Sequence, residues 1–219
     1  MTADEIIQKA YLHANRKAIP PAVGTSKYET LLSIVDSMQK LWATEPGVEW
    51  DSLYALVSVG SISATDTFPI DTTIQYLSKR EGDYAIASNG TSSKTYTIVK
   101  PNQLYAYRNN DVVAQVGRNL KFPSAFSASS SVFGYGLSVP AILYPDDITD
   151  GSDVVQVDDP MWLAYMSAYE FVRNDLVKRN TKDDLLAYAE QSMIKMKQAN
   201  GGQYNTVSTP WTPAGESWI

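Results

Sequence analysis

The sequence contains no cysteine and only one histidine, His13. Without cysteine the chain has no disulfide, no thiolate metal site and no cysteine nucleophile. With one histidine a zinc site lacks its ligand set, and a Ser-His-Asp triad would have to use His13, yet no serine lies in a G-x-S-x-G sequence. Because His13 precedes Arg16 and Lys17 on an expected helix surface, we interpret it as solvated. We therefore predict no catalytic residue, no metal and no cofactor.

Basic charge and long apolar runs are also scarce. The chain has 18 basic and 24 acidic residues, a net charge of −6, which argues against a dedicated nucleic-acid-binding surface. The sequence contains neither the phosphate-binding loop G-x-x-x-x-G-K-[ST] nor the dinucleotide-binding fingerprint G-x-G-x-x-G. No run approaches the roughly 18 apolar residues of a membrane helix, and the start, MTADEIIQKAYLHANRK, does not resemble a signal peptide. We expect a protein made in a reducing cytoplasm, with no membrane partner.

With 44% hydrophobic residues, the chain of 219 residues can form a real core. Two amphipathic helices are expected first. Thr2 followed by Glu5 matches a capping box, and Ser26 followed by Glu29 repeats the pattern. Apolar residues recur at helical spacing in both segments, and Pro46-Gly47 ends the second.

From about Trp50 the apolar residues alternate, which is typical of strands. Asn89-Gly90 lies between two such runs and predicts a hairpin turn, with a longer loop as the alternative because Ser and Thr residues follow it. A second hairpin is expected around Asn109-Asn110, between Leu104–Tyr107 and Val112–Ala114. We interpret this region, rich in Ser, Thr, Tyr and Val, as a small antiparallel β-domain, a sandwich or a barrel.

The helical period then returns. Asp159-Pro160 predicts a helix start, an acidic N-cap followed by proline at the first helical position. Asn180 or Thr181 is expected to cap a further helix, which Gly201-Gly202 stops. Each helix pair alone would leave its stripe exposed, so we predict an α+β fold, a discontinuous helical bundle with an inserted antiparallel β-domain and an extended tail. Its parts are N-terminal helices 1–47, β-rich insertion 48–145, C-terminal helices 146–200 and tail 201–219.

Six aspartates crowd a stretch that holds no Lys or Arg: Asp146, Asp147, Asp150, Asp153, Asp158 and Asp159. A calcium or magnesium site is one interpretation, but the spacing before Gly151 does not fit D-x-[DN]-x-[DN]-G. Paired carboxylates for a glycosidase could also be chosen here, although such pairs are not specific. We favour turn formation and a helix N-terminus that prefers negative charge.

The segment 201–219 combines large apolar groups with one charged side chain, Glu216. Pro210 and Pro213 rule out a regular helix through its middle. A solvated tail is normally charged and poor in aromatics, so this one should be buried against the fold or another chain. The residues expected to bind there are Tyr204, Trp211, Trp218 and Ile219.

Three further aromatic residues, Phe126, Phe133 and Tyr135, lie in or near loops of the expected β-domain. Aromatic side chains supply large contact area at low entropy cost, so these are candidate partner contacts. Packing against their own subunit is the alternative.

The order of elements resembles the head-to-tail adaptor (connector, or neck) proteins of tailed bacteriophages. The opening EIIQKAYLHANRKAI is similar to their first helix. The most similar part runs from Val139 to Asn174, where Asp158-Asp159-Pro160-Met161-Trp162 starts a long helix. The other local parallels are Glu49–Leu53, Phe68–Asp71, Leu143–Pro145 and Val154–Val157. The Ser-rich loop SAFSASSS and the aromatic tail depart from the family's pattern.

This resemblance implies a non-enzymatic structural protein of the virion's head-tail junction. It would form a ring, expected to be a dodecamer, with one face on the portal protein and the other on the next neck or tail protein. DNA would pass through the ring without specific binding, and an extended C-terminal arm would reach the portal. The alternatives are another neck, tail-completion or minor capsid protein, or a virion-associated wall-degrading hydrolase with two acids in a cleft of the β-domain.

Overall fold

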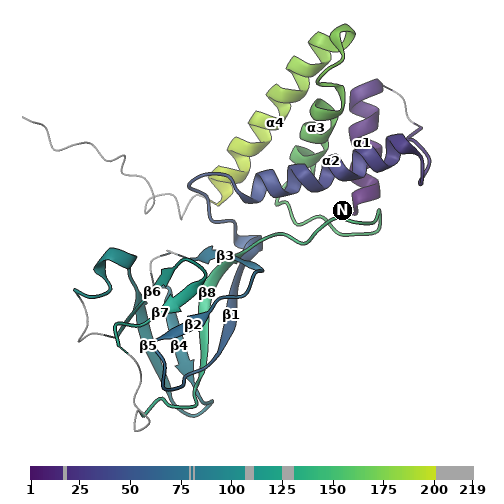
Figure 1. The fold of residues 1–219 in the computed structure, drawn as a ribbon. Coiled ribbons are helices and arrows are strands. Elements are labelled where there is room, and N and C mark those ends of the chain that lie inside the picture. Colours follow the sequence, from purple (N-terminus) through teal and green to yellow (C-terminus); the bar gives the residue numbers. More distant parts are fainter. Residues whose placement is uncertain (17–18, 79, 81, 107–110, 125–130, 201–219) are drawn as a thin grey trace, which may run out of the picture. The chain divides into compact units, whose positions relative to one another are not determined.

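The computed structural model describes residues 1–16, 19–78, 80, 82–106, 111–124 and 131–200. The chain separates into two compact units (Figure 1). The helical unit comprises Met1–Leu53 and the segment from Pro145 onward, and the β unit comprises Tyr54–Tyr144. The helices of the helical unit are α1 (Ala3–Asn15), α2 (Ser26–Ala43), α3 (Pro160–Val172) and α4 (Arg179–Ala199).

Local side-chain caps explain where most of these helices begin. The capping box predicted for α1 is confirmed, since Thr2 and Glu5 exchange side-chain to backbone hydrogen bonds. The N-cap of α3 is Asp159, whose carboxylate accepts from Met161 N–H at 2.9 Å, and Pro160 follows at the first helical position, as predicted. The predicted cap of α2 is wrong by one residue, because Thr25 accepts the bond from Tyr28 N–H.

The predicted start of α4 is wrong as well. Neither Asn180 nor Thr181 caps this helix, which begins at Arg179 after a short 3-10 turn, Leu176–Lys178. Its N-cap residue, Lys178, makes no side-chain capping bond. The chain enters α4 directly from this turn, an arrangement that is frequent at helix N-termini.

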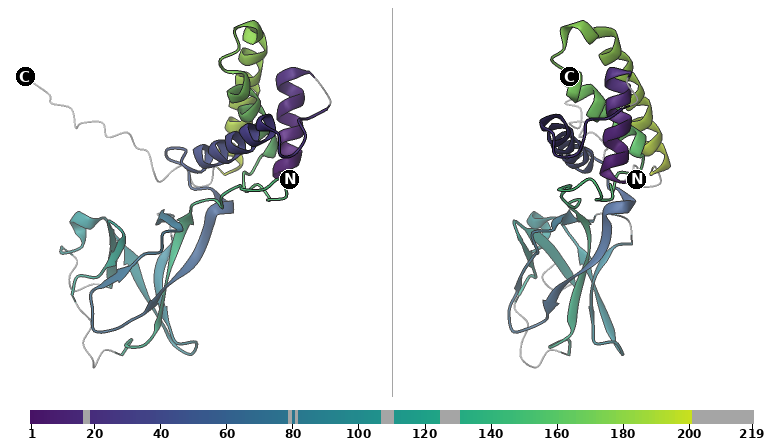
Figure 2. Two further views of the ribbon diagram at one scale, coloured as in Figure 1. Left: turned by 45° about the vertical axis from the view of Figure 1, so that its right-hand side comes forward. Right: turned by 90° about the vertical axis from the view of Figure 1, so that its right-hand side faces the viewer.

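Helix α3 is the centre of the helical unit, and α1, α2 and α4 each pack against it. Its small residues Ala164, Ser167 and Ala168 are fully buried, which lets neighbouring helices approach closely. Figures 1 and 2 show that α2 runs across α1 and α3 rather than alongside them. The discontinuous helical bundle that the sequence predicted is therefore not evident.

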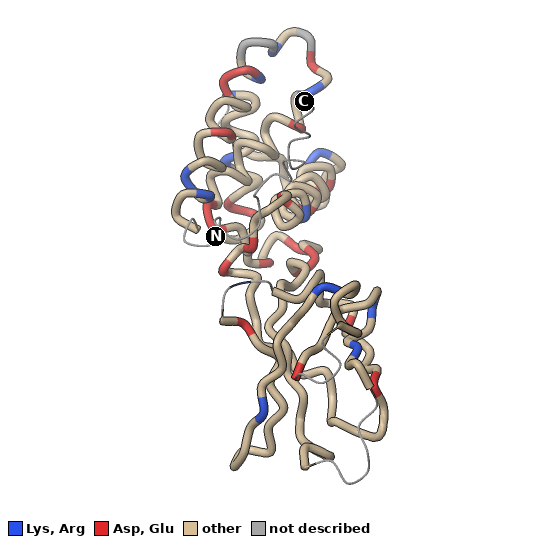
Figure 3. Tube along the Cα trace, turned by 90° about the vertical axis from the view of Figure 1, so that its left-hand side faces the viewer, with Lys and Arg blue, Asp and Glu red and all other residues tan. Residues whose placement is uncertain are grey.

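The loop before α3 clamps the N-terminal end of α1. Ala3 N–H donates to the Asp153 carbonyl at 2.8 Å, and Asp4 N–H donates to the Gly151 carbonyl at 2.9 Å. The Tyr28 hydroxyl donates to the Asp4 carboxylate. Figure 3 shows acidic positions gathered around this end of the chain. Gly151 lies so close that a Cβ there would collide with both the Asp4 and the Tyr28 side chains.

We therefore expect Gly151→Ala to lower the free energy of unfolding by about 1–3 kcal/mol, because a methyl group must displace the partly buried Asp4–Tyr28 hydrogen-bonded pair. Chemical denaturation measures the change. In a Tyr28→Phe background the loss should shrink, since the colliding Tyr28 hydroxyl is gone. Ser152→Ala, in the same loop but without a collision, serves as the control. An equal loss at Ser152 would contradict the close-approach argument.

In its described residues, the β unit holds a mixed sheet of eight strands. Its order is β1-β8-β4-β5-β6-β7-β2, with β3 also pairing with β8. Since β1 and β2 also contact each other, the sheet nearly closes into a barrel. The strands are β1 (Tyr54–Ser61), β2 (Thr67–Pro69), β3 (Ile74–Leu77), β4 (Tyr84–Ser88), β5 (Ser93–Ile98), β6 (Val112–Val116), β7 (Asn119–Lys121) and β8 (Gly136–Leu143).

The predicted fold class is therefore wrong, in its sheet as well as in its bundle. A discontinuous bundle with an inserted antiparallel domain is not evident, because the sheet is mixed, with β5 and β6 pairing in parallel. The hairpin at Asn89-Gly90 is confirmed between β4 and β5. The second predicted hairpin is wrong, since Leu104–Ala106 form a turn and β6 pairs with β5. The segment around Asn109-Asn110 lies outside the described residues.

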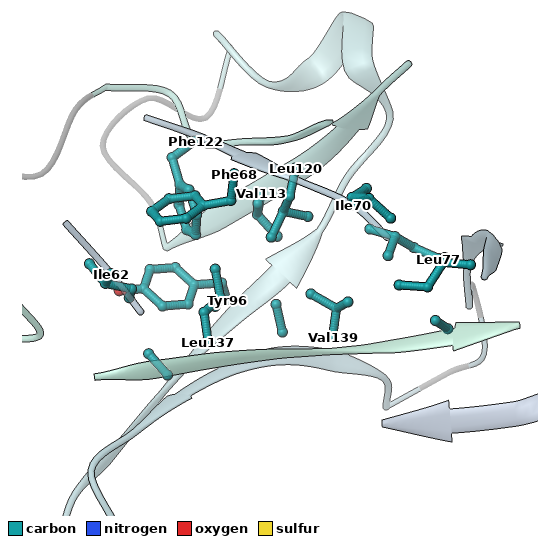
Figure 4. Close-up of a cluster of buried hydrophobic side chains, with 14 of the residues drawn as sticks. Ile62, Phe68, Ile70, Leu77, Tyr96, Val113, Leu120, Phe122, Leu137 and Val139 are labelled. Atoms are coloured by element: carbon teal, nitrogen blue, oxygen red, sulfur yellow. The ribbon is translucent and has the colours of Figure 1, made fainter. Parts of the chain in front are cut away.

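Aromatic rings fill one end of the β-unit core (Figure 4). Phe122 packs edge-on against Tyr96, with ring centroids 5.0 Å apart, and against Phe68 at 5.7 Å. Tyr96 is only 3% exposed. Burial, and secondarily the charge of Asp111, raises the pKa of Tyr96 to about 12.

This raised pKa predicts alkaline destabilisation. In the unfolded chain tyrosine loses its proton near pH 10, whereas folded Tyr96 keeps it up to a pKa of about 12. Stability should therefore fall as the pH rises between these values, by up to about 2–3 kcal/mol. Unfolding measured across this range should show a smaller loss for Tyr96→Phe than for the wild type. Tyr84→Phe, which alters an exposed ring on β4 and keeps the Tyr96 hydroxyl, is the control.

Candidate interaction surfaces

The structure places Phe133 and Tyr135 in different surroundings, just before β8. The Phe133 side chain is exposed, next to Gly134, which adopts a φ of 84°. Tyr135 continues the pairing of β1 with β8, because Ile62 N–H donates to its carbonyl at 2.8 Å, and its ring packs partly against the barrel core. Phe133 is thus presented for contact, whereas Tyr135 is largely structural. The other predicted contacts, Phe126, Tyr204, Trp211, Trp218 and Ile219, lie outside the described residues.

Apolar side chains are exposed at the end of the helical unit where α1 stops and α4 begins. The Lys178 ammonium donates to the Asn15 side-chain carbonyl at 2.5 Å and joins the two segments. Val177 precedes Lys178 in the chain and is 94% exposed. Ile19, between α1 and α2, is 82% exposed. Large apolar side chains left in water are candidate contacts for a partner.

A groove of about 380 Å³ lies beside this end, between α1 and α4. The His13 ring packs 5.0 Å from Tyr165, which in turn lies 5.4 Å from Tyr188. Burial, together with the positive charge of Lys9, lowers the pKa of His13 from its ordinary value. The His13 side chain therefore adds an aromatic face to the groove. The residues that shape the groove are Leu12, His13, Arg16, Asp184, Leu185 and Tyr188.

Arg16 forms the cationic rim of this groove in a left-handed backbone conformation, with a φ of 53°. It is the only non-glycine residue in the described part of the chain with a positive φ. It closes α1, since its N–H donates to the Leu12 carbonyl at 2.7 Å. Glycine or asparagine is more often found at such a position, because a Cβ is unfavourable there.

An acidic cleft of about 380 Å³ lies elsewhere in the helical unit, where α4 ends. Asp51 and Asp158 line it together with Lys195 and Asn200. Burial raises the pKa of Asp158, a hydrogen bond from Ser52 opposes this, and the nearby Asp51 adds to it. The cleft brings two carboxyl groups together, as acid-base hydrolysis requires, but it lies in the helical unit, whereas the hydrolase alternative expects its two acids in a cleft of the β-domain.

Two other acids of the aspartate-rich stretch, Asp150 and Asp153, make turns. The Asp153 carboxylate accepts from the backbone N–H groups of Thr149 and Asp150, and these bonds lower its pKa. The Asp150 carboxylate accepts from Ser152 in the same way. These bonds agree with the turn interpretation. Across the described ranges, no group of three or more His, Asp or Glu side chains is arranged to hold a metal ion.

Sequence reasoning missed the groove between α1 and α4. Its signal lay in apolar residues outside the expected helical stripes, since Leu12 and Tyr188 belong to neither stripe and are exposed. Two side chains of this kind are unremarkable in a sequence, and only the packing of α1 and α4 around α3 brings them together.

No protein-family model and no curated protein matches this chain. None of the helices in the described residues combines the length and the apolar character needed to cross a membrane.

Proposed function

We propose that this protein is a structural head-to-tail adaptor of a tailed bacteriophage. It would form a ring, a dodecamer, that joins the portal protein to the next neck or tail protein at the head-tail junction of the virion. The segment 201–219 would dock on the portal or on a neighbouring subunit. Phe133 would contribute a contact from the β unit.

The observation that carries this proposal is the exposure of large apolar side chains on the helical unit. Val177 and Ile19 are almost fully exposed, although the unit buries three tryptophans. A monomer gains nothing from leaving such groups in water, whereas a subunit of an assembly buries them on a partner. The resemblance to adaptor proteins in the order of elements points the same way.

The negative net charge of the chain is compatible with a channel through which DNA passes. Each chain carries −6, so a ring of copies would repel DNA phosphates on average and would let the duplex slide without specific binding. A basic lining of the channel, seen in an image of the assembled ring, would contradict this part of the proposal.

The experiment adds the purified full-length chain to phage heads that carry a portal but lack an adaptor. We expect co-sedimentation with these heads and none with portal-free capsid shells. Equal binding to the portal-bearing heads and the portal-free shells, or binding to neither, would overturn the proposal.

The acidic cleft gives the hydrolase alternative a specific test. If the chain degrades cell wall, a zymogram with host peptidoglycan should show clearing that Asp158→Asn removes. The adaptor proposal expects no clearing from either protein.

A further inference from the structure

The groove between α1 and α4 presents an open aromatic and apolar surface on an otherwise well-packed unit. Leu12 and Tyr188 are 43% and 52% exposed on its two sides, and buried Leu185 lies on its α4 side. Its volume of about 380 Å³ is large enough for one indole ring. The surface therefore suits a single large aromatic side chain.

The rim of the groove carries one positive and one negative side chain. Arg16 offers a guanidinium on the α1 side, and Asp184 offers a carboxylate on the α4 side. A carboxylate accepts the N–H of an indole, and a guanidinium pairs with a carboxylate. Arg16 also occupies a left-handed conformation that glycine would adopt more easily, so its side chain is kept at a cost to stability.

One segment of this chain has the matching chemistry. In residues 201–219 the only charged side chain is Glu216, and Trp218 follows two residues later. In an extended chain, residues two apart project from the same face, about 6–7 Å from each other. Trp218 can then enter the groove while Glu216 pairs with Arg16.

The reach of the segment favours its own chain over a second copy. Along α4, Tyr188 lies about 18 Å from Asn200, at 1.5 Å per residue. From Asn200 to Trp218 an extended chain spans up to about 60 Å, so the groove is well within reach. A short tether supplies an effective concentration in the millimolar range, which lets one ring and one ion pair bind where a free peptide would not.

We propose that the α1–α4 groove is the docking site for the Glu216-Ser217-Trp218 segment of the same chain. The indole of Trp218 fills the groove between Leu12 and Tyr188, and the Glu216 carboxylate pairs with Arg16. A partner that takes the tail during assembly must compete with this groove. The proposal concerns the isolated chain and does not depend on the adaptor function.

The test follows the indole N–H resonance of Trp218 in the full-length protein, assigned by its loss in Trp218→Phe. Arg16→Glu and Glu216→Arg should each shift it toward the undocked position and weaken docking about fivefold, the scale of a rim ion pair. The double variant restores the pair and should recover the wild-type shift. Trp211→Phe, which alters the other tryptophan of the segment, should leave the resonance in place.

Arg16→Gly provides an independent variant that does not threaten folding. It should raise Tm, because glycine fits the left-handed position, and it should still weaken docking. The shifts should be the same at low and high protein concentration. A shift that grows with concentration would overturn the intrachain proposal in favour of a second copy. If the Trp218 resonance does not change in any Arg16 variant, the proposed docking site is wrong.

Discussion

Removing residues 201–219 is expected to leave a folded protein that no longer joins portal-bearing heads. The described cores of both units are formed by residues before Gly201, and Trp42, Trp50 and Trp162 are all buried there. The apolar side chains of the tail are the ones we assign to a partner. We expect the melting temperature to change little while binding to heads is lost, as measured by co-sedimentation.

A milder variant distinguishes the loss of the two tryptophan side chains from the loss of the whole tail. Trp211→Ala with Trp218→Ala keeps the full chain and removes two anchors, each of the kind that costs about 2–4 kcal/mol of binding when truncated. The control variant, Ser208→Ala with Thr209→Ala, also carries two alanine substitutions in this segment. It should bind to the heads normally. Normal assembly of the double tryptophan variant would refute the docking role of the tail.

Loss of Trp50 is expected to have the largest effect on stability. Its side chain is fully buried, its ring stacks on Trp42 with centroids 4.9 Å apart, and its indole N–H donates to the Trp42 carbonyl at 2.8 Å. Trp50→Ala should lower the free energy of unfolding of the helical unit by about 3–5 kcal/mol, since it removes apolar contacts and leaves a cavity. Denaturant unfolding followed by circular dichroism measures the loss.

Trp50→Phe is the matched variant. It keeps a ring against Trp42 and removes the hydrogen bond, so its loss should be smaller than that of alanine. If both substitutions cost the same, the hydrogen bond and not the ring packing would govern the stability at this position. If neither costs more than about 1 kcal/mol, the burial of Trp50 would not be a stabilising feature.

The helix starts that the sequence predicted correctly depend on short-range chemistry. Thr2 with Glu5, and Asp159 with Pro160, satisfy the free N–H groups of their own first turns, so neighbouring residues suffice to specify them. The turn at Asn89-Gly90 is local in the same sense, because the pair determines the hairpin by its own backbone preference.

The predictions that were wrong concern pairing and packing between segments that are distant in the sequence. The parallel pairing of β5 with β6 joins segments separated by the turn at Pro101–Gln103, and nothing in the alternation of Val112–Val116 distinguishes parallel from antiparallel pairing. The crossing of α2 over α3 likewise depends on which surfaces meet. Phe133 and Tyr135 looked equivalent in the sequence, and only the pairing of β1 with β8 separates an exposed ring from a packed one.

The most direct test of the proposed adaptor function is the mass of the purified protein, measured alone and again with a portal ring. We predict that the portal gathers many copies of the 24.2 kDa chain into a single complex, with the mass increment of a dodecamer. Free protein that remains monomeric before mixing is compatible with this outcome. A mixture in which the portal gains no mass, or only that of a single chain, would contradict the adaptor function.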